Sequence, residues 1–187
     1  ADGSTVIEIR YDRNYYLVNF DMQGGFGTEP VYTRYGSSVG ANDPTRPGYL
    51  FNNWELISYG IETPSDEQKA LYDINAGAIT VPDRNLTYRA RWITQVTKYT
   101  MVFWKENIDD NSFSYWGSLD GLSAMSGSLV SGEDRIDEVG GIDDEEFFTY
   151  NKALTDKNII VEGDGSTIIN VYYTRNRYSI TFKAPGL

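Results

Sequence analysis

Residues 164 to 182 read DGSTIINVYYTRNRYSITF, and residues 2 to 20 read DGSTVIEIRYDRNYYLVNF. The two stretches align without a gap and are identical at 10 of 19 positions, far more than chance allows. The identical pairs are Asp2/Asp164, Gly3/Gly165, Ser4/Ser166, Thr5/Thr167, Ile7/Ile169, Tyr11/Tyr173, Arg13/Arg175, Asn14/Asn176, Tyr16/Tyr178 and Phe20/Phe182. The chain therefore contains an internal repeat, which decides its architecture before any single element is considered.

Each copy has the pattern of two strands joined by a short polar connection. In the first copy the alternating apolar positions are Ile7, Ile9 and Tyr11, followed by Tyr16, Val18 and Phe20. This period of two is typical of half-buried strands. A weaker third copy lies in the middle of the chain, where Tyr88, Ala90 and Trp92 precede Tyr99, Met101 and Phe103.

The three copies predict an array of units that each open and close with one of these strands. We expect four segments: the tail strand of a preceding repeat over 1–12, a first unit over 13–94, a second, divergent unit over 95–174, and the first strand of a following repeat over 175–187. Closing and opening strands of successive units should lie in different sheets, joined by 12–14, 93–98 and 174–176. The rival interpretation is a simple hairpin, since short polar connections also suit hairpins.

Composition excludes several classes of function. The net charge of −11 opposes binding to nucleic acid or to an anionic membrane surface, because both need clustered Lys and Arg. There is no Cys and no His, so disulfides, thiolate metal sites and a Ser-His-Asp arrangement are absent. No apolar run approaches the length of a membrane span, and we expect no membrane insertion.

The first unit resembles the Listeria–Bacteroides repeat, also called the internalin B-type B repeat. The resemblance is carried by Tyr16-x-Val18-x-Phe20, Gly24-Gly25, Tyr35-Gly36, Pro44 to Gly48 with Tyr49-x-Phe51-x-x-Trp54, and the closing Leu86 to Trp92. It implies an α+β, predominantly β, β-grasp-like fold in an extracellular, cell-wall-associated or secreted protein. The chain departs from the family at Asn53, where a glycine is usual, and in a longer insertion at 57–82, which includes an expected helix start at 63–67.

The second unit resembles that family less. Strands are expected at 99–104 and 113–116 around a polar turn at 106–111, with a helical turn over 151–157 and a closing strand over 167–173. Residues 117–146 are rich in Gly and Ser and then acidic. The order of strands is similar to that of mucin-binding-protein repeats, which are also β-grasp-like.

Acidic residues are the first candidates for chemistry. Catalysis needs two carboxylates in different environments, whereas Asp143, Asp144, Glu145 and Glu146 are neighbours and favour a solvated surface run. Calcium is the alternative at this run or at Asp109-Asp110-Asn111, but neither has the alternating spacing of a calcium loop. We therefore expect no catalytic, cofactor-binding or metal-binding residues, and no cofactor.

Glycines, tryptophans and lysines have structural interpretations beside functional ones. The Gly24–Gly27 segment lacks the Lys-Ser/Thr of a phosphate loop, and turn geometry explains it. Trp54, Trp92, Trp104 and Trp116 could line a sugar platform, yet Trp54 and Trp92 fit a core, while Trp116 stays open between core and surface. A Lys–Asn isopeptide crosslink is a further alternative, with candidate lysines Lys69, Lys98, Lys105, Lys152, Lys157 and Lys183.

The sequence thus favours a non-enzymatic stalk or adhesin segment of a bacterial surface protein that attaches to a host or matrix. Neighbouring repeats and a host-surface protein or glycan are the expected partners. An accessory carbohydrate- or protein-binding module of a secreted multidomain enzyme is the alternative. Because residues shared by every copy serve the fold, a ligand site is expected where the copies differ, at 57–82 or 117–146.

Overall fold

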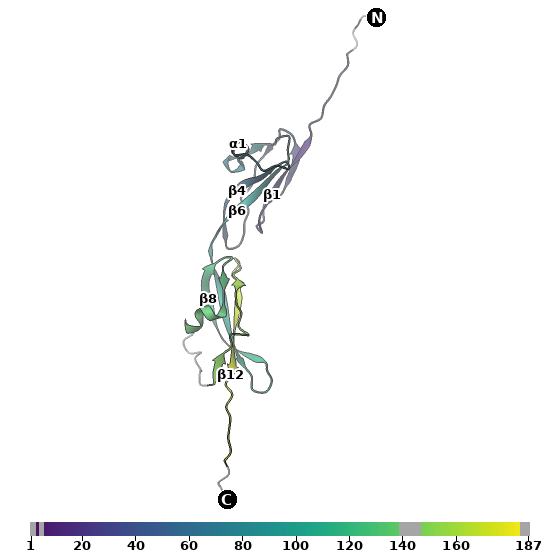
Figure 1. Cartoon of the computed structure of the whole chain (residues 1–187). Helices are drawn as coiled ribbons and strands as arrows, with labels where there is room; N and C mark the ends of the chain where they lie inside the picture. The colour runs from purple at the N-terminus through teal and green to yellow at the C-terminus, as the bar shows by residue number, and fades with distance from the viewer. Residues whose placement is uncertain (1–2, 4–5, 139–146, 184–187) are drawn as a thin grey trace. The chain divides into compact units, whose positions relative to one another are not determined.

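The computed structural model describes residues 3, 6–138 and 147–183, and it divides the chain into two compact units between Ile93 and Thr94 (Figure 1). The fold is α+β and predominantly β, with tandem β-grasp-like units built on mixed sheets, as the repeat and the family resemblance together led us to expect. In the part of the chain that the structure describes, no helix has the length and apolar character that a membrane crossing demands.

The first unit is a four-stranded sheet in the order β2-β1-β6-β4. Its opening strand β1 is parallel to its closing strand β6 and antiparallel to β2. A separate two-stranded sheet pairs β3 with β5, and a capped helix lies between these two strands in the chain. The bounds are β1 Tyr15–Asp21, β2 Val31–Arg34, β3 Ser38–Val39, β4 Tyr49–Tyr59, α1 Asp66–Leu71, η1 Ile74–Ala76, β5 Ile79–Thr80 and β6 Leu86–Thr94.

The second unit repeats this plan strand for strand, in the order β8-β7-β12-β10. Its opening strand β7 is parallel to its closing strand β12 and antiparallel to β8, and β9 pairs with β11 in a small sheet. The bounds are β7 Val96–Glu106, β8 Phe113–Met125, β9 Leu129–Val130, η2 Gly132–Glu138, β10 Phe148–Tyr150, β11 Ile159–Ile160 and β12 Ile168–Arg175. The two units thus share one topology, although their sequences differ in the segments between the opening and closing strands.

A matching glycine turn closes both units. Gly36 and Gly127 each have φ of 79°, a left-handed conformation that side chains with a Cβ rarely adopt. The amide of Gly36 donates to the carbonyl of Val81 at 2.9 Å, and that of Gly127 donates to the carbonyl of Val161 at 2.8 Å. Both valines are fully buried. The turn therefore ties the second strand of each unit to the segment before its closing strand.

The core of each unit lies on one face of its sheet. Alternation along the opening and closing strands places Val18 and Phe20 inside the first unit, and Met101 and Phe103 at the equivalent positions of the second. The buried residues of the first unit are Val18, Phe20, Val39, Trp54, Leu56, Ile74, Ile79, Val81, Leu86, Tyr88 and Ala90. Those of the second are Tyr99, Met101, Phe103, Val130, Phe148, Val161, Ile169, Val171 and Tyr173.

Strands β6 and β7 lie in different sheets, which confirms the expectation for successive units and excludes a hairpin there. The expected connection over 93–98 is wrong, because only Gln95 separates the two strands. The expected helix start is confirmed: Ser65 caps α1 and Gln68 returns its side chain to the Ser65 amide in a capping box. In the second unit, residues 151–157 form a single turn, closed where Thr155 N donates to Asn151 O at 3.1 Å.

Two further expectations need correction. The strand that begins at Phe113 runs to Met125 rather than ending at 116, and register shifts opposite Tyr99/Met101 and Phe103/Trp104 absorb its irregularity. Residues 6–14 and 176–183 form no strand, although their sequences have the pattern of strands. A strand needs a neighbour to satisfy its backbone groups, and no strand of the described residues pairs with either segment.

Replacing Trp54 with Ala should destabilise the first unit by about 3–5 kcal/mol, because the cavity left by a buried ring is costly. Trp54 is 4% exposed and packs against Phe20 and Phe51, with ring centroids 5.0 and 5.4 Å away. Chemical denaturation followed by amide NMR signals of each unit measures the effect. The second unit should keep its stability; a common transition in which both units weaken together would contradict the expected independence.

Candidate functional site

The second unit gathers aromatic side chains on the face of its sheet opposite the core. Trp104 of β7 lies across from Tyr115 of β8 and beside Tyr172 of β12, and Phe113 lies near the start of β8. Tyr115 is 61% exposed, and the other three rings are half-buried. We call these four residues the aromatic row.

The rings of the aromatic row pack against one another. Trp104 stacks on Tyr172 with centroids 6.4 Å apart and an interplanar angle of 17°. Tyr115 meets Trp104 edge-on at 6.3 Å, and Phe113 meets Tyr172 edge-on at 5.0 Å. These are the geometries that aromatic pairs prefer, so the row is a continuous surface rather than four separate side chains.

Hydrogen bonds hold the central ring in place. Trp104 Nε1 donates to Asn170 Oδ1 at 2.9 Å. The Asn170 side chain in turn donates through Nδ2 to Asp156 Oδ2 at 2.9 Å, and its backbone amide donates to the same oxygen at 2.7 Å. Because Asn170 is fixed at both ends of its amide, the indole of Trp104 has a defined orientation.

A set of polar side chains continues the same face along β7 and β8. Thr100 Oγ1 and Ser118 Oγ each donate to a different oxygen of Asp120, both at 3.2 Å. Tyr115 connects the two sets, because its hydroxyl donates to Ser118 Oγ at 3.3 Å. We call Thr100, Ser118 and Asp120 the polar row.

The first unit has an ion pair where the second has the centre of the aromatic row. Asp21 of β1 lies opposite Arg89 of β6, as Trp104 of β7 lies opposite Tyr172 of β12, and Arg89 Nε lies 3.0 Å from Asp21 Oδ2. A hydrogen bond from Gln23 and the nearby Arg89 guanidinium lower the pKa of Asp21. This pair joins β1 and β6, the counterparts of β7 and β12. The fold therefore does not require aromatic residues at the centre of this face.

A second ion pair lies on the same open face of the first sheet. Arg91, two residues beyond Arg89 on β6, is paired with Glu55 of β4. The open face of the first sheet therefore has ion pairs along β6 and a stacked pair of tyrosines, Tyr15 and Tyr32, on β1 and β2. The second sheet has rings at the centre of this face instead of ion pairs.

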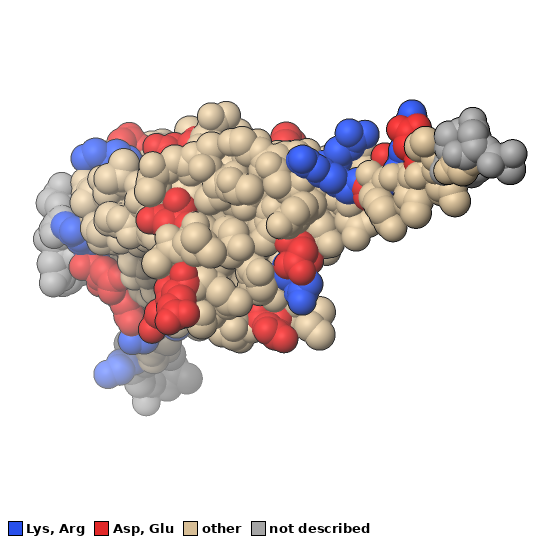
Figure 2. Space-filling view, turned by 90° about the horizontal axis from the view of Figure 1, so that it is seen from above, with Lys and Arg blue, Asp and Glu red and all other residues tan. Residues whose placement is uncertain are grey.

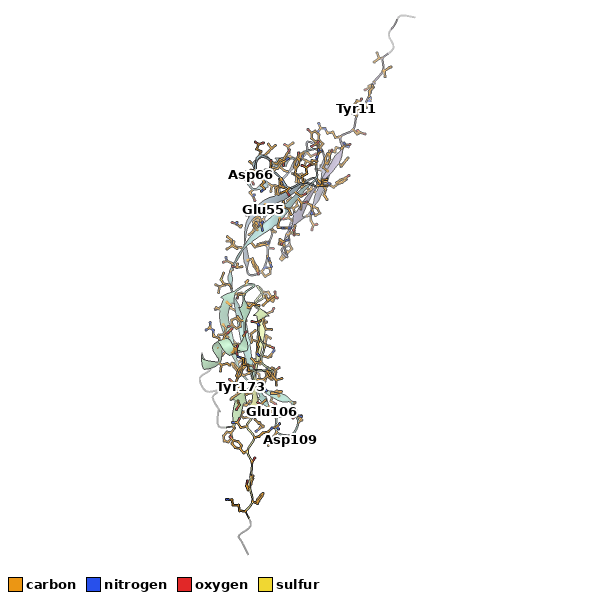
Figure 3. The ribbon with its side chains drawn as sticks, in the orientation of Figure 1. Tyr11, Glu55, Asp66, Glu106, Asp109 and Tyr173 are labelled. Atoms are coloured by element: carbon orange, nitrogen blue, oxygen red, sulfur yellow. The ribbon has the colours of Figure 1, made fainter. Side chains whose placement is uncertain are left out.

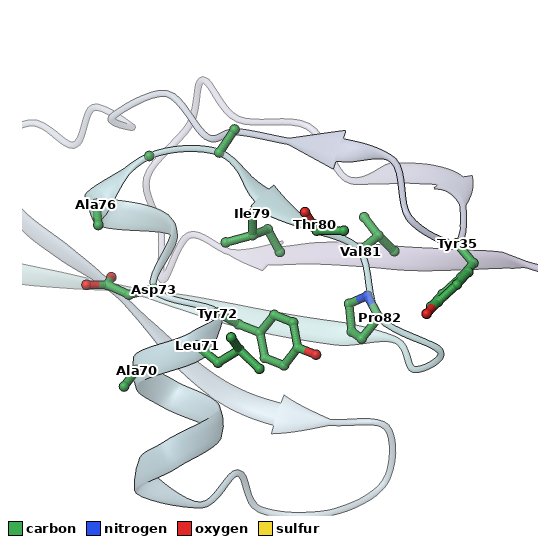
Figure 4. A pocket seen from close by; sticks show the side chains of 12 residues that line it. Tyr35, Ala70, Leu71, Tyr72, Asp73, Ala76, Ile79, Thr80, Val81 and Pro82 are labelled. Carbon is green, nitrogen blue, oxygen red and sulfur yellow. The ribbon is translucent and has the colours of Figure 1, made fainter.

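The insertion at 57–82 forms a hollow in the first unit, with a volume of about 500 Å³ (Figure 4). Leu71, Tyr72, Ile79 and Pro82 line it, together with backbone of the 76–78 segment. Burial, with a smaller effect of Tyr59, raises the pKa of Tyr72 to about 12, so its hydroxyl stays neutral. The hollow is open, its lining is about as polar as it is apolar, and it contains no nucleophile paired with a base among the described residues.

The acidic candidates do not form a site. Asp143 to Glu146 lie outside the described residues. Asp110 and its neighbour Asp109, which Figure 3 labels, lie in the turn between β7 and β8. Hydrogen bonds from Ser112 lower the pKa of Asp110, so its carboxylate serves its own turn. Within the described residues, no group of three acidic side chains is placed to hold a metal ion.

Close packing against Trp92 explains the glycine at position 25 of the Gly24–Gly27 segment. A Cβ on Gly25 would lie 2.4 Å from Cζ2 of Trp92, whose Nε1 donates to Met22 O at 3.0 Å. Trp54 is a core residue as expected, whereas Trp92 is partly buried against the core. Trp116 is also half-buried, on the core face, and Lys105 Nζ lies 3.3 Å from its ring centroid.

The lysines considered for isopeptide bonds mostly have other partners. Lys98 Nζ donates to Ser123 Oγ at 2.8 Å, and Lys152 Nζ lies 2.7 Å from Glu133. Lys69 lies 3.9 Å from Asp66, and Lys105 lies over Trp116. None of these four contacts involves an asparagine amide, so an isopeptide bond has no support from them.

A scan against protein-family models and a search of curated proteins both found no match to this chain. The site is therefore argued from geometry alone. Sequence reasoning named Trp104 among four tryptophans but missed its three companions. The alternation Val102-x-Trp104 and Asn170-x-Tyr172 was a usable signal, since it puts large polar or aromatic groups on the face opposite a buried one.

Replacing Asp21 with Asn should lower the stability of the first unit by about 1 kcal/mol or less at neutral pH, because the pair is partly exposed. Since the pKa of Asp21 is lowered in the folded state, its contribution is present above the unfolded pKa of about 4 and is lost as pH falls through the folded pKa. The free energy of unfolding of the first unit, measured by denaturation of the unsubstituted chain and of the Asp21→Asn variant between neutral pH and about pH 2, tests this pH dependence. A difference that grows toward acid pH would contradict it.

Proposed function

We propose that the chain is a non-catalytic segment of tandem repeats from a bacterial cell-surface protein, where it acts as a stalk or adhesin module in attachment to a host or matrix. Two units with the same strand order support a repeated building block whose contacts are mainly within each unit. The excess of acidic over basic residues supports a partner other than nucleic acid; Figure 2 presents many of the acidic side chains on one view of the surface.

One observation carries the proposal of an array. Ile7 and Ile9 are 80% and 68% exposed, while Ile169 and Val171, their equivalents in the repeat, are fully buried in β12. The same contrast holds at the other end, where Phe182 is 91% exposed and its equivalent Phe20 is buried in β1. Apolar segments of this kind are costly to leave in water.

We infer that 1–12 supply the closing strand of a preceding unit and 175–187 the opening strand of a following one. The absence of His and Cys from the sequence favours a module without catalysis or a cofactor. The alternative, an accessory carbohydrate- or protein-binding module of a secreted multidomain enzyme, draws support from the aromatic row. Both assign binding rather than chemistry to the segment.

A hybrid chain tests the array. Appending residues 21–94 after Phe182 supplies the terminal segment with the remaining strands of a first unit, because Phe182 is equivalent to Phe20. We expect a third unit to fold, in which amides of 178–182 become protected from hydrogen exchange as those of a central strand are.

The same hybrid with Ile180→Asp is the matched control, since it places a charge where Val18 is buried. It should leave the appended unit unfolded and the original two units unchanged. If the hybrid without this substitution leaves 178–182 in fast exchange, the assignment of this segment as an opening strand is wrong.

A further inference from the structure

We propose that the aromatic row and the polar row of the second unit together bind an uncharged glycan chain. The inference deepens the attachment role proposed above and rests on it. It assigns the contact to one face of one unit and gives the chemical class of the ligand. The surface that the two rows form has a shape that suits a sugar chain.

Sugar rings present C–H groups on their faces and hydroxyls around their edges. An aromatic face receives the C–H side, because its electron-rich surface meets weakly positive hydrogens. Trp104, Tyr115 and Tyr172 offer such surfaces while remaining partly exposed, and they also carry polar ring atoms. Side chains of this kind are enriched at binding surfaces because one part is apolar and another polar.

The polar row supplies partners for the hydroxyls at the edge of a stacked sugar. Asp120 is exposed and its two oxygens accept from Thr100 and Ser118, which leaves lone pairs on the carboxylate for further donors. Thr100 and Trp104 are four residues apart on one strand, so the two rows extend over about 13 Å. The ligand is therefore a short stretch of chain rather than a single small ion.

Negative charge on and near this face favours uncharged glycans over anionic ones. Asp120 stands within the face, Asp156 lies behind Asn170, and the whole chain has a net charge of −11. An anionic sugar would meet this field at a cost, whereas an uncharged sugar would not. Lys98 on the same strand already donates to Gly121 O and Ser123 Oγ. The face therefore favours neutral over sialylated or sulfated chains.

The comparison of the two units argues against a purely structural role. Where the second unit pairs Trp104 with Tyr172, the first unit has the Asp21–Arg89 ion pair between its central strands, and its own open-face rings, Tyr15 and Tyr32, lie toward the edge strand β2. The second unit keeps an aromatic surface that the fold does not need. Its central ring is also fixed by Asn170 before any ligand arrives, which reduces the entropy lost on binding.

A glycan fits this face better than a protein partner does. Stable protein interfaces bury about 800 Å² on each side and centre on a desolvated apolar patch. Here the rings form a narrow row, and hydroxyls and a carboxylate continue the same face from Tyr115, so an apolar stretch is followed by a polar one. The two rows match the two kinds of surface on a sugar chain.

The test uses the full chain on an array of neutral oligosaccharides (β-glucans, galactans and chito-oligosaccharides) with sialylated counterparts, and on a panel of immobilised matrix proteins. We expect binding to at least one neutral class and weaker binding to its sialylated form. Tyr115→Ala and Trp104→Ala should each weaken glycan binding by about tenfold or more, as truncation of an aromatic anchor does. Trp104→Phe should keep part of the affinity, because a ring remains.

Tyr32→Ala is the matched control: Tyr32 is an exposed tyrosine on β2 of the first sheet, 68% exposed, and its removal should leave glycan binding unchanged. Tyr115 is on the surface, so its variant should fold even if Trp104→Ala does not; amide NMR spectra establish this. Glycan binding that survives Tyr115→Ala in a folded protein overturns the inference but leaves the attachment role. Binding to matrix proteins alone also overturns the glycan inference but leaves the attachment role. Binding to neither the glycans nor the matrix proteins overturns both the inference and the attachment role.

Discussion

The fold of each unit depends on a parallel pairing between its first and last strands. β1 with β6, and β7 with β12, are the centre of each sheet, and strands that lie between them in the chain occupy the edges. Parallel strands cannot be joined by a tight turn, so everything between them must form a long crossover. In both units this crossover contains the two edge strands of the main sheet, a small second sheet and a turn or short helix.

This constraint explains why the repeat is strongest at the ends of a unit. Central strands are buried on one face and bonded on both edges, so their alternation is restricted. The crossover is restricted only at particular points, such as the glycine turns at Gly36 and Gly127. The rest can diverge, and the first unit uses that freedom for α1 while the second extends β7 and β8.

The open face of the central strands is the other place where divergence is tolerated. Its residues alternate with the core residues, so they can change without disturbing the core. At the centre of this face the first unit has an ion pair, with a tyrosine pair nearer the edge, and the second has aromatic rings linked to a hydrogen-bonded asparagine. A repeated scaffold can thus keep its stability while one copy acquires a binding surface.

The sequence by itself determined the repeat, the alternation of the central strands, the capped helix start at Ser65 and the burial of Trp54, because each follows from local pattern or chemistry. Tertiary structure alone decided that β8 continues through Gly117 to Met125, since its register is set by pairing with β7. It also decided the site. Trp104, Tyr115 and Tyr172 lie on three strands, and only the parallel pairing of β7 with β12 and the antiparallel pairing with β8 bring their rings together.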